Sequence, residues 1–347
     1  MSTMRFVPSL VAVLLFGWSP AGPSAAAQPA GQTLDVYVID VEGGQSTLVV
    51  TPSRQAMLID AGWPGFDGRD AGRIEAAMKQ AGVTKLDYLV VTHYHTDHVG
   101  GVPAIAARVP VGTFVDHGPT VESATDAGYV AYLERRGKSK HLSVKPGETI
   151  PLTGVEVTVV ASAGETIHAP LAGAGAANPL CAAHQPQPED PSENARSVGL
   201  VIKYGAFRMV DLGDLTWNKE FALACPANLL GTADLYLTSH HGNQQSGPPA
   251  LVHALAPRAA IMNNGATKGG AASAWKIVHD SPGLLDFWQL HTAVQAGPAA
   301  NTSADHIANI DESTAYGLKV SARNDGSFSV TNARNSVAKS YGVRGQH

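Results

Sequence analysis

The segment Thr92 to Gly101 constrains the possible fold and chemistry more than any other part of the sequence. It reads Thr-His-Tyr-His-Thr-Asp-His-Val-Gly-Gly and directly follows an apolar, strand-like run at 86–91. A turn at the end of a buried strand can direct its imidazoles and its carboxylate toward one point. Because histidine and aspartate are good zinc ligands, the segment predicts a metal site at a strand end.

The rest of the chain alternates segments with strand and helix patterns, which indicates an α/β protein. Apolar and β-branched runs predict strands at 33–39, 46–51, 56–60, 86–91, 113–115, 155–160, 198–204, 207–212, 233–238, 259–262, 315–320 and 327–330. Helical spacing predicts helices at 71–81, 102–109, 124–136, 218–224, 249–255 and 272–279. The segment 161–195 has no periodicity, so we expect either a loop near the site or a surface insertion.

The first residues have the features of a secretory signal. Residues 1–27 carry one charge, Arg5, followed by an apolar run at 6–18 and by Ala25-Ala26-Ala27. We therefore expect a signal peptide at 1–27, a single domain at 28–347 and a periplasmic or secreted location, with an uncleaved membrane anchor as the alternative. Cys181 and Cys225 can pair in an oxidising compartment, but sequence alone cannot place them within bonding distance.

The composition narrows the choice of ligands and partners. The chain has 24 Lys and Arg against 29 Asp and Glu, and binding to nucleic acid relies on clustered basic side chains. A nucleic-acid partner therefore stays open but is not favoured by the charge. We expect a small-molecule or phosphoester substrate and no stable membrane span after signal cleavage. The oligomeric state stays open.

The pattern His93-x-His95-x-Asp97-His98 resembles the signature of the metallo-β-lactamase fold superfamily. Motifs at 58–62, 212–215 and 239–242 agree with it. The segment 40–46, Asp-Val-Glu-Gly-Gly-Gln-Ser, together with the late Ser-His-His-Gly, is most similar to the hydrolase-like domain of the bacterial competence (DNA-uptake) family. The resemblance implies an α/β fold, an αβ/βα four-layer sandwich in which two mixed β-sheets pack face to face with helices on the outer faces.

The resemblance also implies a ligand set for two zinc ions. The matching residues are His93, His95, Asp97, His98, Asp214 and His241. The first two would hold one metal, Asp97 and His98 the second, and Asp214 would bridge both. Either His240 or His241 would complete the second site. We prefer His241 as the ligand and His240 as a proton donor or substrate contact.

The third ligand of the first metal and the role of Asp60 stay open. The first metal lacks an obvious third ligand, and the candidates are His117, His168, His184 or water, so a one-metal enzyme also remains open. Asp60 would either orient a metal ligand or cap a turn. Asp211 is expected to be structural or supporting, because it points away from Asp214 on the same strand.

The resemblance predicts an exported zinc-dependent hydrolase that uses a metal-activated hydroxide. Asp97 would orient the nucleophile, and either His240 or a metal-bound water would protonate the leaving group. We place phosphoester or phosphodiester substrates slightly ahead of β-lactams and lactones, because the competence-family resemblance favours them. A non-catalytic metal-binding or interaction module is the alternative from another class.

Overall fold

A computed structural model describes residue 1 and residues 33–345 of the chain. The predicted signal peptide at 1–27 therefore lies outside the described residues, apart from Met1, and it stays a prediction, as does the domain assigned to 28–347. Within residues 33–345, every helix is too short or too polar to cross a membrane.

The first sheet has nine strands in the order β18-β17-β16-β1-β2-β3-β4-β5-β6. It is mixed, because β3 to β6 pair in parallel whereas the other strands pair antiparallel. The bounds are β1 Leu34–Val38, β2 Thr47–Val50, β3 Ala56–Ile59, β4 Leu86–Val90, β5 Val111–Asp116, β6 Lys140–Ser143, β16 Leu318–Ala322, β17 Phe328–Asn332 and β18 Ala338–Tyr341.

The second sheet has the order β15-β14-β13-β12-β11-β10-β8-β7, and β9 pairs with β8. It is also mixed, because β11 to β15 are parallel and the remaining strands are antiparallel. The bounds are β7 Thr149–Leu152, β8 Val155–Ser162, β9 Glu165–Thr166, β10 Gly199–Tyr204, β11 Phe207–Asp211, β12 Leu235–Leu237, β13 Ala259–Met262, β14 Asp286–His291 and β15 Ile307–Asn309.

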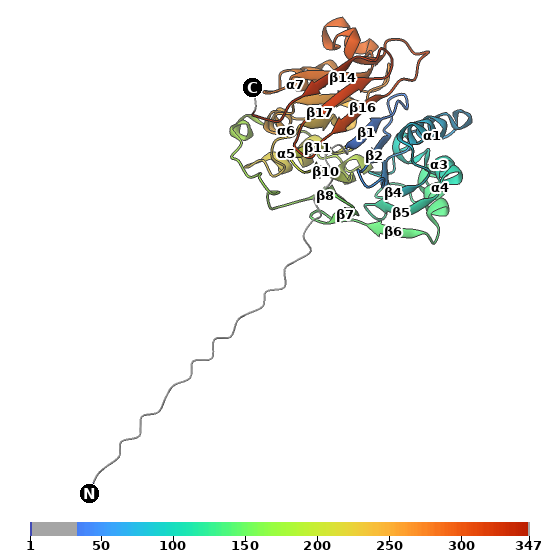
Figure 1. The fold of residues 1–347 in the computed structure, drawn as a ribbon, viewed down its shortest axis with the longest axis horizontal. Coiled ribbons are helices and arrows are strands. Elements are labelled where there is room, and N and C mark those ends of the chain that lie inside the picture. The colour runs from blue at the N-terminus through green and yellow to red at the C-terminus, as the bar shows by residue number, and fades with distance from the viewer. Residues whose placement is uncertain (2–32, 346–347) are drawn as a thin grey trace. The chain divides into compact units, whose positions relative to one another are not determined.

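Helices lie on the outer faces of the two sheets (Figure 1). Those on the first sheet are α1 Arg69–Ala81, α2 Thr96–Val99, α3 Val102–Arg108 and α4 Ala127–Arg136, and those on the second are α5 Trp217–Ala224, α6 Pro249–Leu255 and α7 Ala272–His279. Short 3₁₀ turns are η1 Phe66–Gly68, η2 Pro179–Ala183, η3 Glu193–Arg196, η4 Ser239–Gly242, η5 Val294–Ala296, η6 Pro298–Ala300 and η7 Ala304–His306.

Three apolar cores separate these four layers. Along β1, Val36 and Val38 face the core between the sheets, whereas Tyr37 faces the helices, because successive strand side chains alternate. The core beneath α1 includes Ile74 and Met78, which are one helical turn apart. Central and outer cores on both sheets confirm the predicted αβ/βα four-layer sandwich.

Several element boundaries differ from the sequence expectations. The helix expected to start at residue 124 begins at Ala127, because the Asp126 side chain accepts hydrogen bonds from two backbone N–H groups and caps it there. The aperiodic segment 161–195 contains the end of β8, β9, η2 and most of η3. A disulfide between Cys181 and Cys225, with a Cα–Cα distance of 5.7 Å, ties this segment to the end of α5.

Candidate metal centre

The candidate site is built where parallel strands end. Asp60 follows β3, the His-rich turn follows β4, and Asp214 follows β11. The two adjacent histidines lie in η4, just after β12. Because carboxyl ends of parallel strands share one edge of a sheet, the alternating topology gathers these side chains. The turn before Asp214 needs Gly213, which has φ 57° and where an added Cβ would lie 3.0 Å from the Thr92 Cβ.

Four buried side chains form what we call the central cluster: Asp97, His98, Asp214 and His241. One ligand atom from each lies within 4.8 Å of the others. The His98 Nε2 is 3.3 Å from Asp214 Oδ2 and 3.2 Å from His241 Nε2. The Asp97 Oδ2 is 3.2 Å from His241 Nε2. Two imidazoles and two carboxylates thus converge on one small volume.

His93 and His95, predicted to hold the first metal, lie next to each other at this cluster. The His93 Nε2 is 3.0 Å from His95 Nδ1 and 3.9 Å from Asp214 Oδ2. His93 is fully buried, whereas His95 is partly exposed and its Nε2 lies 3.2 Å from Glu122 Oε1. His93 therefore lies beside the carboxylate that was expected to bridge two metals, and His95 lies beside His93.

The two adjacent histidines of η4 occupy different positions. Both have a left-handed backbone with φ 54°, which is costly for a residue with a side chain. His241 belongs to the central cluster, whereas His240 reaches only Asp214 Oδ2 within it, at 3.5 Å from its Nε2. The His240 Nδ1 lies 3.3 Å from Ser246 Oγ. This arrangement is compatible with His241 as ligand and His240 as a contact beside it.

The ring nitrogens of His98 and His241 that point away from the central cluster contact neighbouring side chains. Asp60, itself left-handed with φ 59°, lies 2.7 Å from His98 Nδ1 through Oδ2 and accepts the Thr92 backbone N–H at 2.8 Å through Oδ1. Asn263 Nδ2 lies 3.3 Å from His241 Nδ1. Such contacts fix the ring orientation and leave the other nitrogen free to bind a metal.

The electrostatics of the cluster favour a cation. Burial would raise the pKa values of Asp97 and Asp214, but the imidazoles around them hold both pKa values well below the usual range. Burial would lower the pKa of His98, yet the carboxylates of Asp214, Asp97 and Asp60 raise it well above its usual value. Burial and the neighbouring His98 lower the pKa of His93 well below its usual value, although Asp214 acts against them. The site therefore concentrates negative charge around imidazole nitrogens.

A divalent metal fits the residues that are present. The Asp214 Oδ1 is buried and has no hydrogen-bond partner within residues 33–345, although a buried carboxylate oxygen normally has one. The donor set of imidazole nitrogens and carboxylate oxygens is the set that zinc accepts, and other divalent transition metals accept it too.

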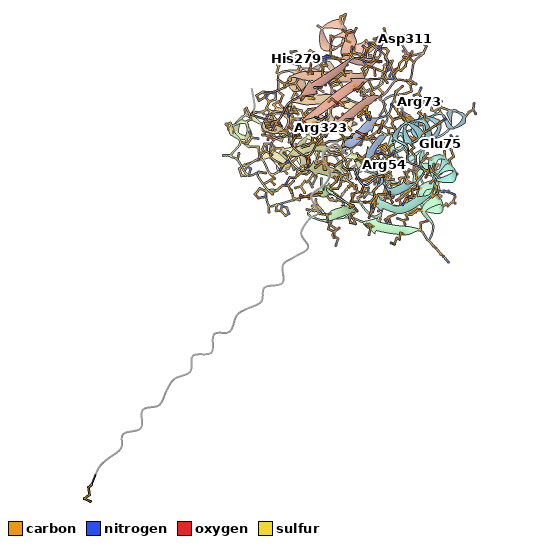
Figure 2. The ribbon with its side chains drawn as sticks, viewed as in Figure 1. Arg54, Arg73, Glu75, His279, Asp311 and Arg323 are labelled. Carbon is orange, nitrogen blue, oxygen red and sulfur yellow. A yellow bond between two sulfur atoms is a disulfide. The ribbon has the colours of Figure 1, made fainter. Side chains whose placement is uncertain are left out.

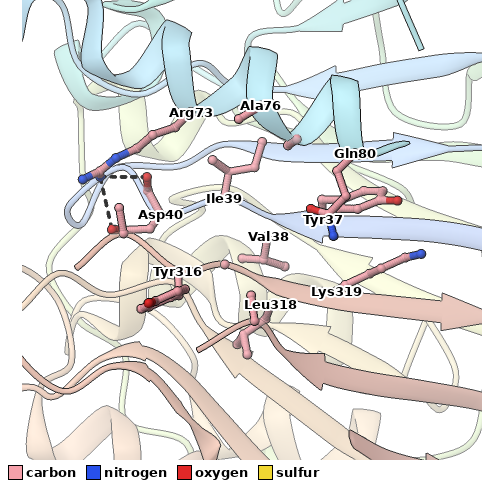
Figure 3. A pocket seen from close by; sticks show the side chains of 14 residues that line it. Tyr37, Val38, Ile39, Asp40, Arg73, Ala76, Gln80, Tyr316, Leu318 and Lys319 are labelled. Carbon is pink, nitrogen blue, oxygen red and sulfur yellow. Dashed lines mark hydrogen bonds and ion pairs between the residues drawn. The ribbon is translucent and has the colours of Figure 1, made fainter. Parts of the chain in front are cut away.

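The motif at 40–46 builds a separate group, which we call the arginine-closed cluster: Asp40, Glu42, Arg73 and His291. The His291 Nε2 lies 2.8 Å from Asp40 Oδ1, and the Arg73 guanidinium contacts Asp40 Oδ2 at 3.1 Å and Glu42 Oε1 at 2.9 Å. Figure 3 shows Arg73 reaching from α1 to Asp40. Here a side chain already supplies the positive charge.

The candidates for a third ligand of the first metal do not reach the centre. His117 Nε2 bonds to Glu193 at 2.8 Å, the His184 ring stacks on Phe221 at 3.7 Å, and His168 is exposed. Among the described residues, none of the three belongs to a group of metal-binding side chains. Ser197 lies beside the centre instead, with its Oγ 3.4 Å from His93 Nδ1 and accepting the Asp214 N–H at 3.2 Å.

Sequence reasoning missed other residues at the site. Lys268 Nζ contacts Asp97 Oδ2, and no motif marked it, because it comes from an irregular loop between β13 and α7. Glu220, buried in α5, accepts a hydrogen bond of 2.5 Å from Ser239 Oγ in η4, and burial raises its pKa to about 8.

Asp211 lies in the supporting position that the sequence predicted. Both of its carboxylate oxygens accept from Gln45 Nε2 at 3.2 Å, and burial raises its pKa to about 6.

Comparison with known proteins gives matches to part of the chain. The family described as "Metallo-beta-lactamase superfamily" matches residues 39–178. Hydroxyacylglutathione hydrolase of Brucella anthropi is 35% identical over 101 residues, which is 29% of this chain and 33% of that protein. The enzyme of the same name from Acidiphilium cryptum is 32% identical over 101 residues, or 29% of this chain and 35% of that protein. The chain thus spans about a third of the length of these curated relatives.

Among solved structures, the CmlA beta-hydroxylase E377D mutant is similar with a TM-score of 0.46 and 17% identity, covering 76% of this chain and 54% of that one. The family match and the curated relatives each cover part of the chain, and the family match at residues 39–178 is to the metallo-β-lactamase superfamily. They reach the level of the superfamily and do not single out the competence family.

Proposed function

We propose that this chain, whose residues 39–178 match the metallo-β-lactamase superfamily, is a zinc-dependent hydrolase that acts at the central cluster. The observation that carries the proposal is the buried convergence of Asp97, His98, Asp214 and His241, with the Asp214 Oδ1 unpartnered. Together with His93 and His95, these side chains would hold two zinc ions.

Zinc at this position would supply a Lewis acid for the scissile group and would lower the pKa of a water molecule toward neutrality. Asp97 lies at the rim of the cluster, where its carboxylate can orient that water. His240 presents Nε2 toward Asp214, while its Nδ1 faces Ser246 Oγ. We assign it to protonation of the leaving group or to substrate contact.

The substrate class is the less constrained part of the proposal. We keep phosphoesters and phosphodiesters first, because the motif at 40–46 and the late Ser-His-His-Gly resemble the competence family. Acyl substrates such as β-lactams and lactones are second, and hydroxyacylglutathione joins them because the curated relatives are named as its hydrolases. Small molecules are preferred over nucleic acid, since acidic side chains outnumber basic ones.

We also propose that the protein is exported to the periplasm or secreted. The sequence of residues 1–27 supports this through its signal-like pattern. The disulfide between Cys181 and Cys225 agrees, because disulfides persist mainly in oxidising compartments. Fractionation of cells expressing the full chain, with and without residues 1–27, tests this point.

The activity is tested on protein freed of metal with a chelator and then loaded with zinc. Substrates are bis-4-nitrophenyl phosphate, a lactone and nitrocefin. We expect zinc-dependent turnover that is fastest for the phosphodiester and falls at least about 100-fold in Asp214→Asn. Asp280→Asn, an exposed aspartate at the end of α7, is the matched control.

Each outcome of this screen has a clear meaning. Faster nitrocefin turnover would reverse our order of substrates. Absence of zinc-dependent turnover with every substrate, in a protein that binds zinc, would favour the non-catalytic metal-binding module.

A further inference from the structure

Lys268 brings a positive charge to the edge of the central cluster. Its Nζ contacts Asp97 Oδ2 and donates to the Gly43 backbone oxygen at 2.9 Å. The Trp63 ring lies beside it, with its centroid 5.4 Å from the Nζ. The Lys268 side chain is 39% exposed, so the ammonium group lies between the cluster and solvent.

The loop that carries Lys268 is held in place on two sides. The Gly265 N–H donates to the Lys268 backbone oxygen at 2.9 Å, and the Gly270 N–H donates to the His241 oxygen at 2.8 Å. An added Cβ on Gly43 would lie 2.9 Å from the Lys268 Cβ. Because the backbones approach this closely, the base of the lysine side chain has a defined position relative to His241.

The pairing of Lys268 depends on what Asp97 binds. Among the ion pairs of the described residues, Lys268 is the one lysine or arginine that contacts a member of the central cluster. Zinc would compete for the Asp97 carboxylate, because that carboxylate belongs to the proposed ligand set. An ammonium group has three N–H donors, and the contacts of Lys268 with Asp97 and Gly43 occupy two of them, so at least one donor is available for an anion.

We propose that Lys268, with Trp63 beside it, forms a subsite for an anionic group of the substrate, a phosphate or carboxylate oxygen placed next to the scissile bond. This inference rests on the proposed hydrolase function and narrows its substrate to anionic esters or amides. The ammonium binds the anion, and the indole ring packs against the adjacent part of the substrate. The shared chemistry is a negatively charged oxygen, which comes either from the reacting phosphoryl group or from a separate carboxylate.

The first test measures binding and needs no turnover. Calorimetry of inorganic phosphate with zinc-loaded protein compares wild type with Lys268→Met, Lys268→Arg and the control Lys276→Met, an exposed lysine of α7. We expect the phosphate Kd to rise about tenfold in K268M, to change less than about threefold in K268R, and to stay at the wild-type value in K276M. Zinc content and Tm are measured for each variant, and Lys268→Gln repeats the comparison with a polar side chain.

The second test identifies the source of the anion. Mono-4-nitrophenyl succinate carries a free carboxylate, 4-nitrophenyl acetate is its neutral counterpart, and bis-4-nitrophenyl phosphate has an anionic reacting group. A KM increase of about tenfold in K268M for the succinate but not for the acetate supports a separate carboxylate. An increase confined to the phosphodiester supports the reacting phosphoryl group.

The proposal is overturned if zinc-loaded K268M and K268Q bind phosphate as the wild type does and show unchanged KM values for all three esters. Zinc-dependent turnover would survive that result, so the proposed function would stand. If instead no ester is hydrolysed by wild type, the proposed function fails, and the phosphate Kd values still decide whether Lys268 binds anions.

Discussion

The central cluster and the arginine-closed cluster use the same side-chain types and differ in where the positive charge comes from. In each, carboxylate and imidazole atoms lie within 4.8 Å of one another. Arg73 bonds to both carboxylates of the arginine-closed cluster, and His291 Nε2 donates to Asp40 Oδ1. Among the described residues, Lys268 is the one lysine or arginine at the edge of the central cluster, and Asp214 Oδ1 has no hydrogen-bond partner there.

This difference shows that proximity of aspartate and histidine does not by itself make a metal site. A buried carboxylate must be paired, and a guanidinium held by two carboxylates does so within the chain. Where the chain leaves carboxylate and imidazole atoms converging without such a partner, a bound cation completes the pairing. We therefore assign metal binding to the central cluster and a structural role to the arginine-closed cluster.

The largest effect is expected from removing the Asp214 carboxylate, which we propose bridges the two metals. Asp214→Asn should reduce zinc affinity by at least about 100-fold, because a ligand contributes more than the contacts that orient it, which are worth 10–100-fold. Equilibrium dialysis with zinc measures the change, with Asp280→Asn as the control. Retention of full zinc content by the Asp214 variant would contradict the assignment.

Breaking the arginine-closed cluster should lower the stability of the fold and leave the zinc affinity of the central cluster unchanged. Arg73→Met leaves Asp40, which is fully buried, without its guanidinium, and we expect a loss of about 2–3 kcal/mol in the free energy of unfolding. Lys79→Met, on the exposed part of α1, is the matched control. Figure 2 labels Arg73, which lies on α1. A loss of zinc in the Arg73 variant, with its fold intact, would break the contrast between the clusters.

A smaller effect on zinc affinity is expected from Asp60, which contacts the ring nitrogen of His98 that points away from the central cluster. Asp60→Asn removes the charge that faces His98 Nδ1 at 2.7 Å, so zinc affinity should fall about 10–100-fold with little change in Tm. Competition with a chromophoric chelator measures this affinity. Unchanged affinity would mean that Asp60 only caps its turn, the alternative left open by the sequence.

The buried pair of Glu193 and His117 lies outside both clusters and should make the free energy of unfolding depend on pH. Burial would raise the pKa of Glu193, but hydrogen bonds from His117, Val121 and Thr120 lower it to about 2. A lowered carboxyl pKa stabilises the fold above the unfolded value near 4.5, and this contribution is lost as pH falls toward 2. Glu193→Gln should therefore cost about 1–3 kcal/mol at pH 7.

Urea unfolding of wild type and Glu193→Gln at pH 7, 4.5 and 3 checks this sign. The difference between the two proteins should shrink as pH falls below 4.5. A difference that stays constant over this range would show that the Glu193 charge contributes nothing.

The sequence was informative where burial or ligand chemistry leaves a regular pattern. The strand before the His-rich turn follows from its apolar run, whereas the four-layer fold and the grouping of Asp214 with the η4 histidines were implied by the resemblance of the motifs to a known superfamily. Strand β6 was missed because all four of its residues are exposed, so it has no alternation. Ser197, Lys268 and the Arg73–Asp40 pair were missed because these contacts join distant segments, and no local spacing encodes them.

The most direct test of the assignment is an anomalous difference map at the zinc edge from crystals of the zinc-loaded protein. Our interpretation predicts density at the central cluster, with His98, His241, Asp97 and Asp214 atoms about 2.0–2.2 Å from zinc. It also predicts none between Asp40, Glu42 and His291. Density at the arginine-closed cluster, or a central cluster without zinc under saturating conditions, would contradict the assignment.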